Sequence, residues 1–513
     1  MPPVDQFDVE SRIRGILNRR PAVGLAVGVV RDGRLESFHA HGLADIASRT
    51  PVTEDTVFRV GSLTKTFTAI AVMQLQEQRL VDLDAPANHY LRAYRLIPAD
   101  PGWRPATVRH LLTHTAGIRE VLHPSGVVRP LFGETVKAGQ PMPSLAEYYR
   151  PGLRIGAEPG TRFRYTDHGF ATLGQLVADV TGQPFDRYLR EHVFAPLGMA
   201  DTELVRSDAA QSRLATGYEL RAGGAKPYPD YEVVTAGGAA AYSTPRDIAR
   251  YLAALLGGGV NEHGSVLKPE TLATMFTAQY QPDPRIPGLG LAFFRSNPGG
   301  RIVLEHQGVV PAFTSQIFVA PDDGIGLLAV TNGTRNGAFW LPMEMNRLFN
   351  DLLGAPDKAI RPDLPHHPEV WADICGWYYL PGSLTDVRVR GMIGAGFEVF
   401  VRRGQLCCRC LSPALALLKG FVLHPDDTED PYVFRADLRR FDLTMRLVFS
   451  HDPAGRTTAV HLDMMPLSAQ KQGAATNPRR WASGALLALS ATAIASRPRR
   501  RARRHSGAHT GAV

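Results

Sequence analysis

Gly61-Ser62-Leu63-Thr64-Lys65 places a serine one helical turn before a lysine. If a helix begins near Ser62, the serine hydroxyl and the lysine amine project from the same side and can meet within hydrogen-bond distance. Apolar residues recur at helical spacing through this segment and beyond it: Leu63, Phe67, Ile70 and Met73. The pattern therefore predicts a helix whose start carries a nucleophile and its base.

The serine needs help from its surroundings, because a hydroxyl is a weak nucleophile at neutral pH. Lys65 offers a group that takes the proton, and the helix N-terminus offers a positive environment for the developing alkoxide. For Lys65 to act as a base, burial must lower its pKa, which is ordinarily about 10.4. Ser-x-x-Lys also occurs by chance as a solvated pair at a helix start, so the other segments of the chain decide between the two interpretations.

The composition indicates a globular protein with more than one domain. The chain has 513 residues, of which 44% are hydrophobic and 21% are charged, so a large catalytic domain and a smaller second domain are expected. The formal net charge is +8, but residues 478–513 alone carry eight arginines and no acidic residue. The positive charge therefore comes from a terminal tail rather than from a basic face of the folded body, and no nucleic-acid partner is expected.

Residues 1–18 are charged and lack the apolar core of a secretory signal, which favours a cytoplasmic location. The four cysteines all lie in the last third of the chain, at positions Cys375, Cys407, Cys408 and Cys410. On a strand, Cys408 and Cys410 share one face while Cys407 points to the other, which favours reduced core cysteines over a zinc site. No metal or other cofactor is predicted.

A second polar segment, Phe163-Arg164-Tyr165-Thr166-Asp167-His168-Gly169, precedes a predicted helix. The apolar residues of that helix have the expected spacing: Phe170, Leu173 and Val177. A tyrosine at such a junction can place its phenol over the serine as a proton shuttle, and Asp167 faces the same cleft if the segment is extended. The alternative interpretation makes Tyr165 a half-buried packing residue.

Two further segments frame the expected site. In His110–Ile118 a short helix is stopped by glycine, and His114 is interpreted as a structural residue that hydrogen-bonds the surrounding backbone rather than as a base. Val303–Gly308 heads a strand that resumes at Gln316–Ala320. The small Gly308 lets an extended substrate approach the backbone of this strand.

Three motifs occur in one order along the chain: Ser62-x-x-Lys65, Tyr165-x-Asp167 and His306-x-Gly308. Together they resemble the serine beta-lactamase and penicillin-binding-protein superfamily, and its class C beta-lactamase-related serine hydrolases in particular, which include esterases and D-amino-acid peptidases. Leu112–Gly117 and Pro196–Met199 are similar to further phrases of the same family pattern.

The resemblance covers roughly residues 8–350 and implies a beta-lactamase-like α/β (α+β) catalytic domain over residues 8–355. In this domain an antiparallel sheet is flanked by helices and accompanied by an all-helical subdomain. It implies that Ser62 is the acylated nucleophile and that Lys65 and Tyr165 form the proton-transfer pair. Water then attacks the acyl-enzyme while the same proton relay runs in reverse.

The substrate side implied by the resemblance consists of Asp167, His306, Gly308 and Val309. His306 is the counterpart of the lysine in the family's Lys-Thr-Gly, and the backbone amides of Ser62 and Val309 form the oxyanion hole. Each such donor stabilises a tetrahedral oxyanion by about 3 to 4 kcal/mol. The partner implied is a small-molecule ester or amide substrate.

Two positions depart from the family pattern. Asp167 stands where relatives usually have asparagine, and an ionised carboxylate cannot donate a hydrogen bond to a substrate carbonyl. It also raises the pKa of a nearby Lys65. This argues against efficient beta-lactam hydrolysis and leaves open ester cleavage or a substrate whose ammonium pairs with Asp167. His306 in place of lysine is a weaker cation at neutral pH, which weakens recognition of a carboxylate.

The last third of the chain predicts a separate domain. Residues 356–368 indicate a linker, and 369–467 contain short alternating or apolar runs separated by turns, which predicts a small all-β domain that looks like the lipocalin-like domain of some relatives. In the tail, 478–513, an apolar segment at 481–496 is about 24 Å long as a helix, short of a membrane span of roughly 30 Å. Its basic flanks within 479–504 leave open a peripheral contact with an anionic membrane, or an undocked tail.

The sequence therefore predicts a serine hydrolase that acts through an acyl-enzyme on Ser62, either an esterase or an enzyme similar to D-amino-acid peptidases. One alternative is a non-catalytic binding protein that retains the fold, which Asp167 alone favours. Another is a true beta-lactamase or cell-wall carboxypeptidase, and the carboxypeptidase requires an exported active site. The sequence indicates no particular oligomeric state.

Overall fold

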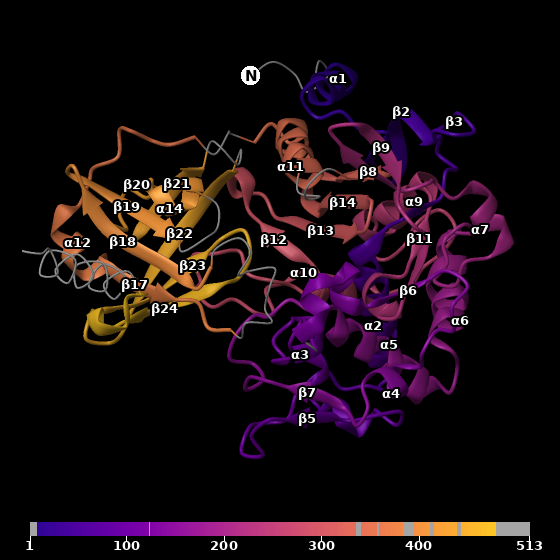
Figure 1. Cartoon of the computed structure of the whole chain (residues 1–513), viewed down its shortest axis with the longest axis horizontal. Coiled ribbons are helices and arrows are strands. Elements are labelled where there is room, and N and C mark those ends of the chain that lie inside the picture. Colours follow the sequence, from indigo (N-terminus) through magenta and orange to yellow (C-terminus); the bar gives the residue numbers. More distant parts are fainter. Residues whose placement is uncertain are drawn as a thin grey trace, which may run out of the picture.

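The computed structural model describes residues 8–122, 124–334, 340–355, 359–382, 394–410, 415–438 and 443–478. Two bodies lie side by side: a larger one of helices and strands, built from the first two thirds of the chain, and a barrel of strands built from the last third (Figure 1). Within the described ranges, no helix has the length and apolarity needed to cross a membrane. The apolar segment and arginine-rich tail predicted in 478–513 lie, from residue 479 onward, outside these ranges.

A seven-stranded antiparallel sheet forms the centre of the larger body, in the order β12-β13-β14-β15-β1-β2-β3. The N-terminal hairpin therefore pairs with strands from the far end of the domain, with Leu25 opposite Thr331. The strands are β1 (Gly24–Arg31), β2 (Arg34–Asp45), β3 (Thr50–Pro51), β12 (Phe294–Ser296), β13 (Val303–Val310), β14 (Phe313–Ala320) and β15 (Ile325–Thr331). The antiparallel sheet with flanking helices that the resemblance implied is confirmed.

Helices cover both faces of this sheet, so its central strands are apolar throughout rather than alternating. In β1, Val27 and Val29 join the cluster on the side of α1 (Val9–Arg19) and α11 (Trp340–Leu352). Ala26 and Val30, one residue out of phase, join the larger cluster on the opposite side. Because successive side chains of a strand point to opposite faces, this continuous run is what a doubly covered strand requires.

The larger cluster is formed around α2 (Thr64–Glu77), which the Ser-x-x-Lys segment opens. The sequence predicted an amphipathic helix, but residues 64–75 are all buried, so α2 is surrounded on every side. Its polar side chains are therefore paired inside the core: Thr68 donates to the Gly237 carbonyl at 2.8 Å and Gln74 to the His192 carbonyl at 2.7 Å. Burial of the Thr68 hydroxyl and the Gln74 amide nitrogen is tolerated because each of these donors has an acceptor.

The remaining helices of the larger body lie around α2 and beyond it, at the right of Figure 1. They are α3 (Val108–Leu112), α4 (Leu145–Tyr148), α5 (Asp167–Thr181), α6 (Phe185–Leu189), α7 (Asp208–Arg213), α8 (Ala236–Ala239), α9 (Pro245–Leu256) and α10 (Pro269–Phe276). Short strands connect them in pairs or threes: β4 (Phe58–Arg59) with β11 (Tyr242–Ser243), β5 (Leu96–Pro98) with β7 (Leu153–Ile155), β6 (Thr135–Lys137) with β10 (Tyr231–Val233), and β8 (Tyr218–Arg221) with β9 (Gly224–Pro227) and β16 (Gly333–Thr334). The helical part of the larger body therefore also contains small strands.

The second body is a closed barrel in which each strand pairs with the next along the chain. Its described strands are β17 (Gly376–Tyr379), β18 (Gly396–Arg402), β19 (Gln405–Cys410), β20 (Phe421–Pro425), β21 (Val433–Leu438), β22 (Leu443–His451), β23 (Thr457–Leu462) and β24 (Ser468–Gln472), with α12 (Pro368–Ile374) and α14 (Leu415–Lys419) beside them. The predicted end of this domain at residue 467 is wrong, because β24 pairs with β17 and closes the barrel. Cys408 and Cys410 both join the barrel's buried cluster, as their shared face predicted.

Candidate active site

Ser62 lies in a tight turn that leads directly into α2. Residues Gly61–Leu63 form one turn of 3-10 helix, and α2 begins at Thr64. Thr64 fixes the junction, because its hydroxyl donates to the Gly61 carbonyl at 2.6 Å and accepts from the Ala241 amide at 3.0 Å. The serine is therefore presented at the N-terminal end of a buried helix, where the helix dipole favours negative charge on its oxygen.

The side-chain nitrogen of Lys65 contacts several segments of the chain. Its Nζ donates to Ser62 Oγ at 3.1 Å and to the Gly238 carbonyl at 2.8 Å, and it forms an ion pair with Asp167. It also shares a hydrogen bond with Tyr165, whose ring centroid lies 4.9 Å away. Lys65 is fully buried and Asp167 is 1% exposed. The predicted meeting of serine hydroxyl and lysine amine is thus present, with no room for a solvated lysine.

The charge state of Lys65 differs from the one that a lysine base requires. Burial lowers the pKa of the amine, but the Asp167 carboxylate and the Tyr165 phenol outweigh it, and the pKa of Lys65 is raised above its ordinary value. The condition for a lysine base, a pKa lowered by burial, is therefore not met, and the effect predicted for Asp167 is present. Asp167 holds Lys65 as an ammonium, which donates its hydrogen bond to the serine oxygen.

Tyr165 comes from the segment that leads into α5, and rings hold it on two sides. Its ring lies 4.3 Å from that of His114 and is stacked on Phe294 at 6.4 Å between centroids. Thr166 caps α5 by accepting from the His168 amide, and its own amide donates to His114 Nδ1 at 3.3 Å. The structural role predicted for His114 is confirmed, because it fixes the backbone next to Tyr165.

His306 is a neutral acceptor rather than a weak cation. It lies on β13, fully buried, and its Nδ1 is 2.7 Å from the Gln307 carbonyl, so Nδ1 carries the proton and donates it. Nε2 is left as an acceptor, with no hydrogen-bond partner among the described residues. Burial first and Lys65 second lower the pKa of His306 to about 3. At neutral pH this residue offers a lone pair where a lysine would offer an ammonium.

Gly308 brings β13 against the serine turn. A Cβ at this position would lie 1.9 Å from the Val60 carbonyl oxygen and 2.3 Å from Ser315 Oγ. A Cβ on Gly61, which has φ +55°, would in turn lie 3.0 Å from the Val309 nitrogen. Glycine is needed here first for the fold, since strand and turn approach too closely for a side chain. The result is that the Val309 amide lies beside the turn that carries Ser62.

One contributor to the site was missed by the sequence analysis. Ala236–Ala239, which none of the three motifs includes, forms α8, and its Gly238 carbonyl accepts from Lys65. The signal was the paired glycines: a Cβ on Gly237 would lie 2.4 Å from the Phe170 carbonyl oxygen, and one on Gly238 would lie 3.0 Å from Asp167. Only glycines let α8 pack close enough to α5 to reach the lysine.

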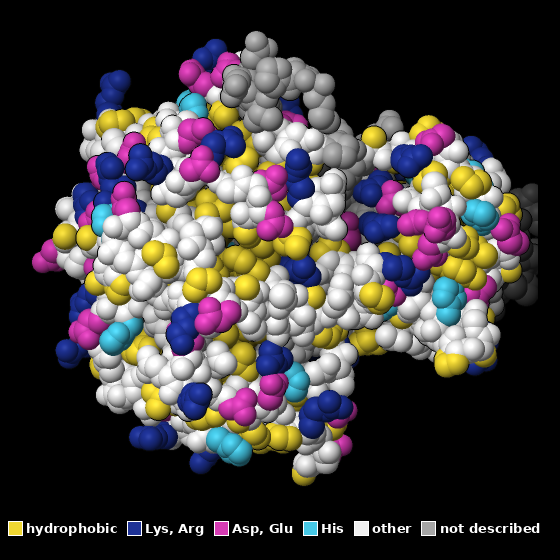
Figure 2. Space-filling model, turned by 180° about the vertical axis from the view of Figure 1, so that it is seen from behind, with side chains coloured by type: hydrophobic (Ala, Val, Ile, Leu, Met, Phe, Trp, Pro, Cys, Tyr) yellow, Lys and Arg dark blue, Asp and Glu magenta, His cyan; other side chains and the backbone are white. Residues whose placement is uncertain are grey.

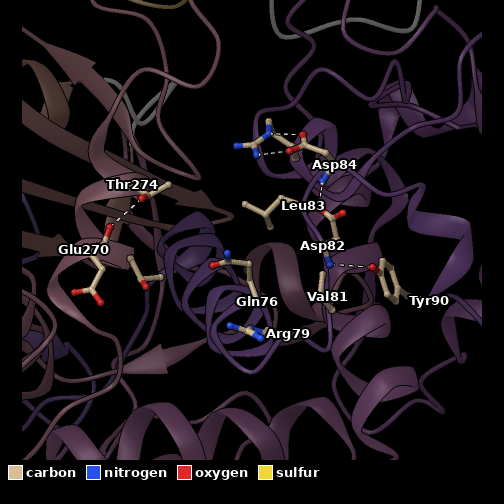
Figure 3. A pocket seen from close by; sticks show the side chains of 11 residues that line it. Gln76, Arg79, Val81, Asp82, Leu83, Asp84, Tyr90, Glu270 and Thr274 are labelled. Carbon is tan, nitrogen blue, oxygen red and sulfur yellow. Dashed lines mark hydrogen bonds and ion pairs between the residues drawn. The ribbon is translucent and has the colours of Figure 1, made fainter.

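A cavity of about 580 Å³ lies at the other end of α2, roughly 20 Å along the helix from Ser62 (Figure 3). Two of its charged side chains pair with each other, since Arg109 donates to both oxygens of Asp84 at 2.7 Å. Tyr90 accepts from the Asp82 amide on the same side. This cavity lies on the same helix as Ser62, but none of the residues of the three motifs lines it.

Comparisons with known proteins agree with this geometry. A family model described as Beta-lactamase matches residues 9–348. Penicillin-binding protein 4 from Amycolatopsis lactamdurans is 26% identical over 399 residues, which cover 74% of this chain and 99% of that protein. Esterase EstB from Burkholderia gladioli is 29% identical over 356 residues, covering 63% and 88%. The octameric penicillin-binding protein homologue from Pyrococcus abyssi shares the fold, with a TM-score of 0.59 and 23% identity over 90% of this chain and 99% of that one.

Proposed function

The chain belongs to the beta-lactamase family, and we propose that it is a serine hydrolase that forms an acyl-enzyme on Ser62 and cleaves small uncharged esters or D-amino-acid amides. The observation that carries this proposal is the buried hydrogen bond of 3.1 Å between Lys65 Nζ and Ser62 Oγ. A serine held this way at a helix start has a cation to stabilise its oxygen as the proton leaves.

The proton of Ser62 then goes to Tyr165. Because Asp167 favours the ammonium of Lys65, the lysine serves as a fixed cation between the serine oxygen and the phenol oxygen rather than as the first acceptor. This step takes Tyr165 as the phenolate, and its oxygen shares a hydrogen bond with the same ammonium. As the Ser62 oxygen attacks the carbonyl carbon, the proton moves to the Tyr165 oxygen and from there to the leaving group, and water repeats the steps in deacylation.

We assign the backbone amides of Ser62 and Val309 as the hydrogen-bond donors to the oxyanion of the tetrahedral intermediate. The close approach of Gly61 and Gly308 supports this assignment, since it brings β13 alongside the serine turn. Two amides fixed in this way bind the transition state more strongly than the substrate, because the negative charge that they contact develops only in the transition state.

The charges of the site favour substrates without a carboxylate. Lys65 and Asp167 compensate each other, and His306 is neutral, so these three groups offer no net positive charge to a carboxylate. This supports an esterase or amidase over a beta-lactamase or a cell-wall carboxypeptidase, whose substrates carry that group.

The barrel supports a second, structural assignment. Its described strands follow one another around the wall in chain order, which is the up-and-down arrangement of lipocalins. We assign it as a lipocalin-like domain in that architectural sense.

The test is the intact mass of the protein after incubation with a fluorophosphonate probe, for wild type and Ser62→Ala. A single adduct on wild type only supports an activated serine, and hydrolysis of p-nitrophenyl butyrate and D-phenylalaninamide, with nitrocefin as the carboxylate-bearing comparison, then ranks the substrates. A well-folded wild type without an adduct would instead favour a binding protein that retains the fold. An adduct on Ser62→Ala would show that a residue other than Ser62 is the nucleophile.

A further inference from the structure

Residues 279–294, between α10 and β12, form an arm that reaches from the catalytic domain to the barrel; we name it the docking hairpin. Its two sides are held by backbone bonds between Tyr280 and Leu289, at 2.9 and 3.1 Å. The tip, residues 283–286, contacts the barrel, and the base lies beside the segment that carries Tyr165. Basic and acidic side chains gather on the barrel where it meets the larger body (Figure 2).

Arg285 fastens the tip of the hairpin. It pairs with Asp283 on the hairpin itself at 2.8 Å and with Asp430 of the barrel at 2.7 Å, and it donates to the Phe449 carbonyl of β22 at 2.8 Å. Arg446 of the barrel donates back to the Arg285 carbonyl at 3.3 Å. An arginine with this many fixed partners is a geometric clamp, because its planar donors must satisfy several acceptors at once.

Ile286 adds an apolar contact at the same tip. It is 2% exposed and forms a small cluster with Val433 and Val448, which lie opposite each other on β21 and β22. The tip is therefore held both by charge and by burial, and the two kinds of contact can be removed separately.

The base of the hairpin holds the tyrosine segment. The backbone of Phe163 hydrogen-bonds the Tyr280 hydroxyl, two residues before Tyr165. Phe163, Leu289 and Phe294 share one buried cluster with barrel residues, and Tyr165 packs against that cluster. The ring of Phe294 is the one stacked on Tyr165, with 22° between the ring planes. The wall behind the phenol is thus continuous with the barrel.

We propose that the barrel positions Tyr165 through the docking hairpin, with Arg285 and Ile286 as positioning residues at its tip. The inference rests on the proposed acyl-enzyme reaction for its readout. The Tyr165 oxygen has to lie within hydrogen-bond distance of the serine proton it accepts, and Tyr165 lies ahead of α5 rather than within it. A displacement of about 1 Å at such a group costs roughly 10²-fold in rate.

The experiment compares Arg285→Ala and Ile286→Ala with Arg456→Ala in the full chain. Arg456 pairs only with Asp452 among the described residues, on an exposed turn of the barrel, and is the matched control. With p-nitrophenyl butyrate, both tip variants should lower kcat by about 10- to 100-fold and leave KM within about twofold, while the control stays within twofold of wild type. Thermal unfolding verifies that each variant is folded, and Ile286→Ala decides the question if Arg285→Ala does not fold.

A double-mutant cycle separates positioning from a general loss of structure. In a Tyr165→Phe background, Arg285→Ala and Ile286→Ala should change the residual rate by less than about twofold, because the hydroxyl they position is gone. A full multiplication of the two effects, or folded tip variants with wild-type kcat, would overturn the proposal. Failure of the proposed function itself looks different, since the fluorophosphonate adduct on Ser62 would then be missing from wild type.

Discussion

Lys65 and Asp167 form a fully buried ion pair at the side of Ser62, and this pair sets the chemistry of the site. The carboxylate keeps the lysine charged, and the charged lysine donates to the serine oxygen. In a neutral site the same lysine would be a proton acceptor. In the reaction that we propose, this carboxylate therefore assigns the serine proton to Tyr165 rather than to Lys65.

Lys65→Ala should lower the rate of Ser62 acylation by about 10³-fold or more, because it removes the cation that stabilises the serine oxygen. It should also destabilise the fold by about 3 to 5 kcal/mol, since Asp167 is left buried without its charge partner. Fluorophosphonate labelling and urea denaturation measure the two effects. Lys226→Ala, at an exposed position of β9, is the control. Adding Asp167→Asn to Lys65→Met should restore stability but not acylation; acylation by Lys65→Ala at the wild-type rate would refute the role of the lysine.

The pH dependence of stability should carry the signature of His306. Its pKa is about 6.5 in the unfolded chain and about 3 in the fold, where burial and Lys65 oppose its protonation. Between these values the unfolded chain binds a proton that the folded chain does not, so the free energy of unfolding falls as the pH falls through this window. Urea titrations at pH 4 and pH 7 should show a smaller loss for His306→Gln than for wild type, and His263→Gln, at a partly exposed site, should match wild type. Equal losses in all three proteins would contradict a neutral, buried His306.

Much of this site could be predicted because each of its motifs is short and local. Ser62 and Lys65 are one turn apart, so local geometry alone brings their side chains together, and Tyr165 and Asp167 lie together at a helix start. The effect of Asp167 on the pKa of Lys65 was predicted, but the complete burial of the pair was not. That burial depends on segments far along the chain, such as α8, whose Gly238 carbonyl accepts from Lys65.

Two further features could not be predicted from the sequence: the burial of α2 on all sides and the last strand of the barrel. The apolar spacing of Leu63, Phe67 and Ile70 predicted a helix with one buried face, yet Thr68 and Gln74 on its other faces are buried too. Their hydrogen-bond partners are carbonyls of segments distant in the sequence, and a local sequence pattern does not predict such contacts. The strand at 468–472 was missed for a similar reason: it is polar and short, and its place is decided by pairing with β17.

Gly308→Ala should disrupt the contact between β13 and the serine turn. The added Cβ would lie 1.9 Å from the Val60 carbonyl oxygen, so strand or turn has to move. Overpacking of this kind costs about 1 to 3 kcal/mol in stability, and the displaced turn should slow acylation as well. Gly15→Ala on α1, where a Cβ meets nothing closer than 3.7 Å, is the matched control and should be neutral or slightly stabilising in thermal unfolding. A Gly308→Ala variant as stable and as fast as wild type would show that the strand adjusts without cost.

Asp167→Asn should turn the site toward the chemistry of its beta-lactam-cleaving relatives. The change replaces an acceptor-only carboxylate with an amide that can donate to a substrate carbonyl. It also removes the charge that raises the pKa of Lys65, so the amine becomes available as a proton acceptor at lower pH. Acylation by the chromogenic cephalosporin nitrocefin should rise by about tenfold or more, the effect of one good hydrogen bond to a charged transition state.

The control for this change is Asp208→Asn, because Asp208 is the first residue of α7 as Asp167 is of α5, but is exposed. Any effect of losing an acid from a helix start is common to both variants, whereas the gain toward the cephalosporin should be confined to Asp167→Asn. The same variant should shift the acid limb of the pH–rate profile to lower pH, since a lysine with a lower pKa deprotonates earlier. A gain in rate without that shift would assign the effect of Asp167 to substrate binding alone, and a shift without a gain would assign it to proton transfer alone.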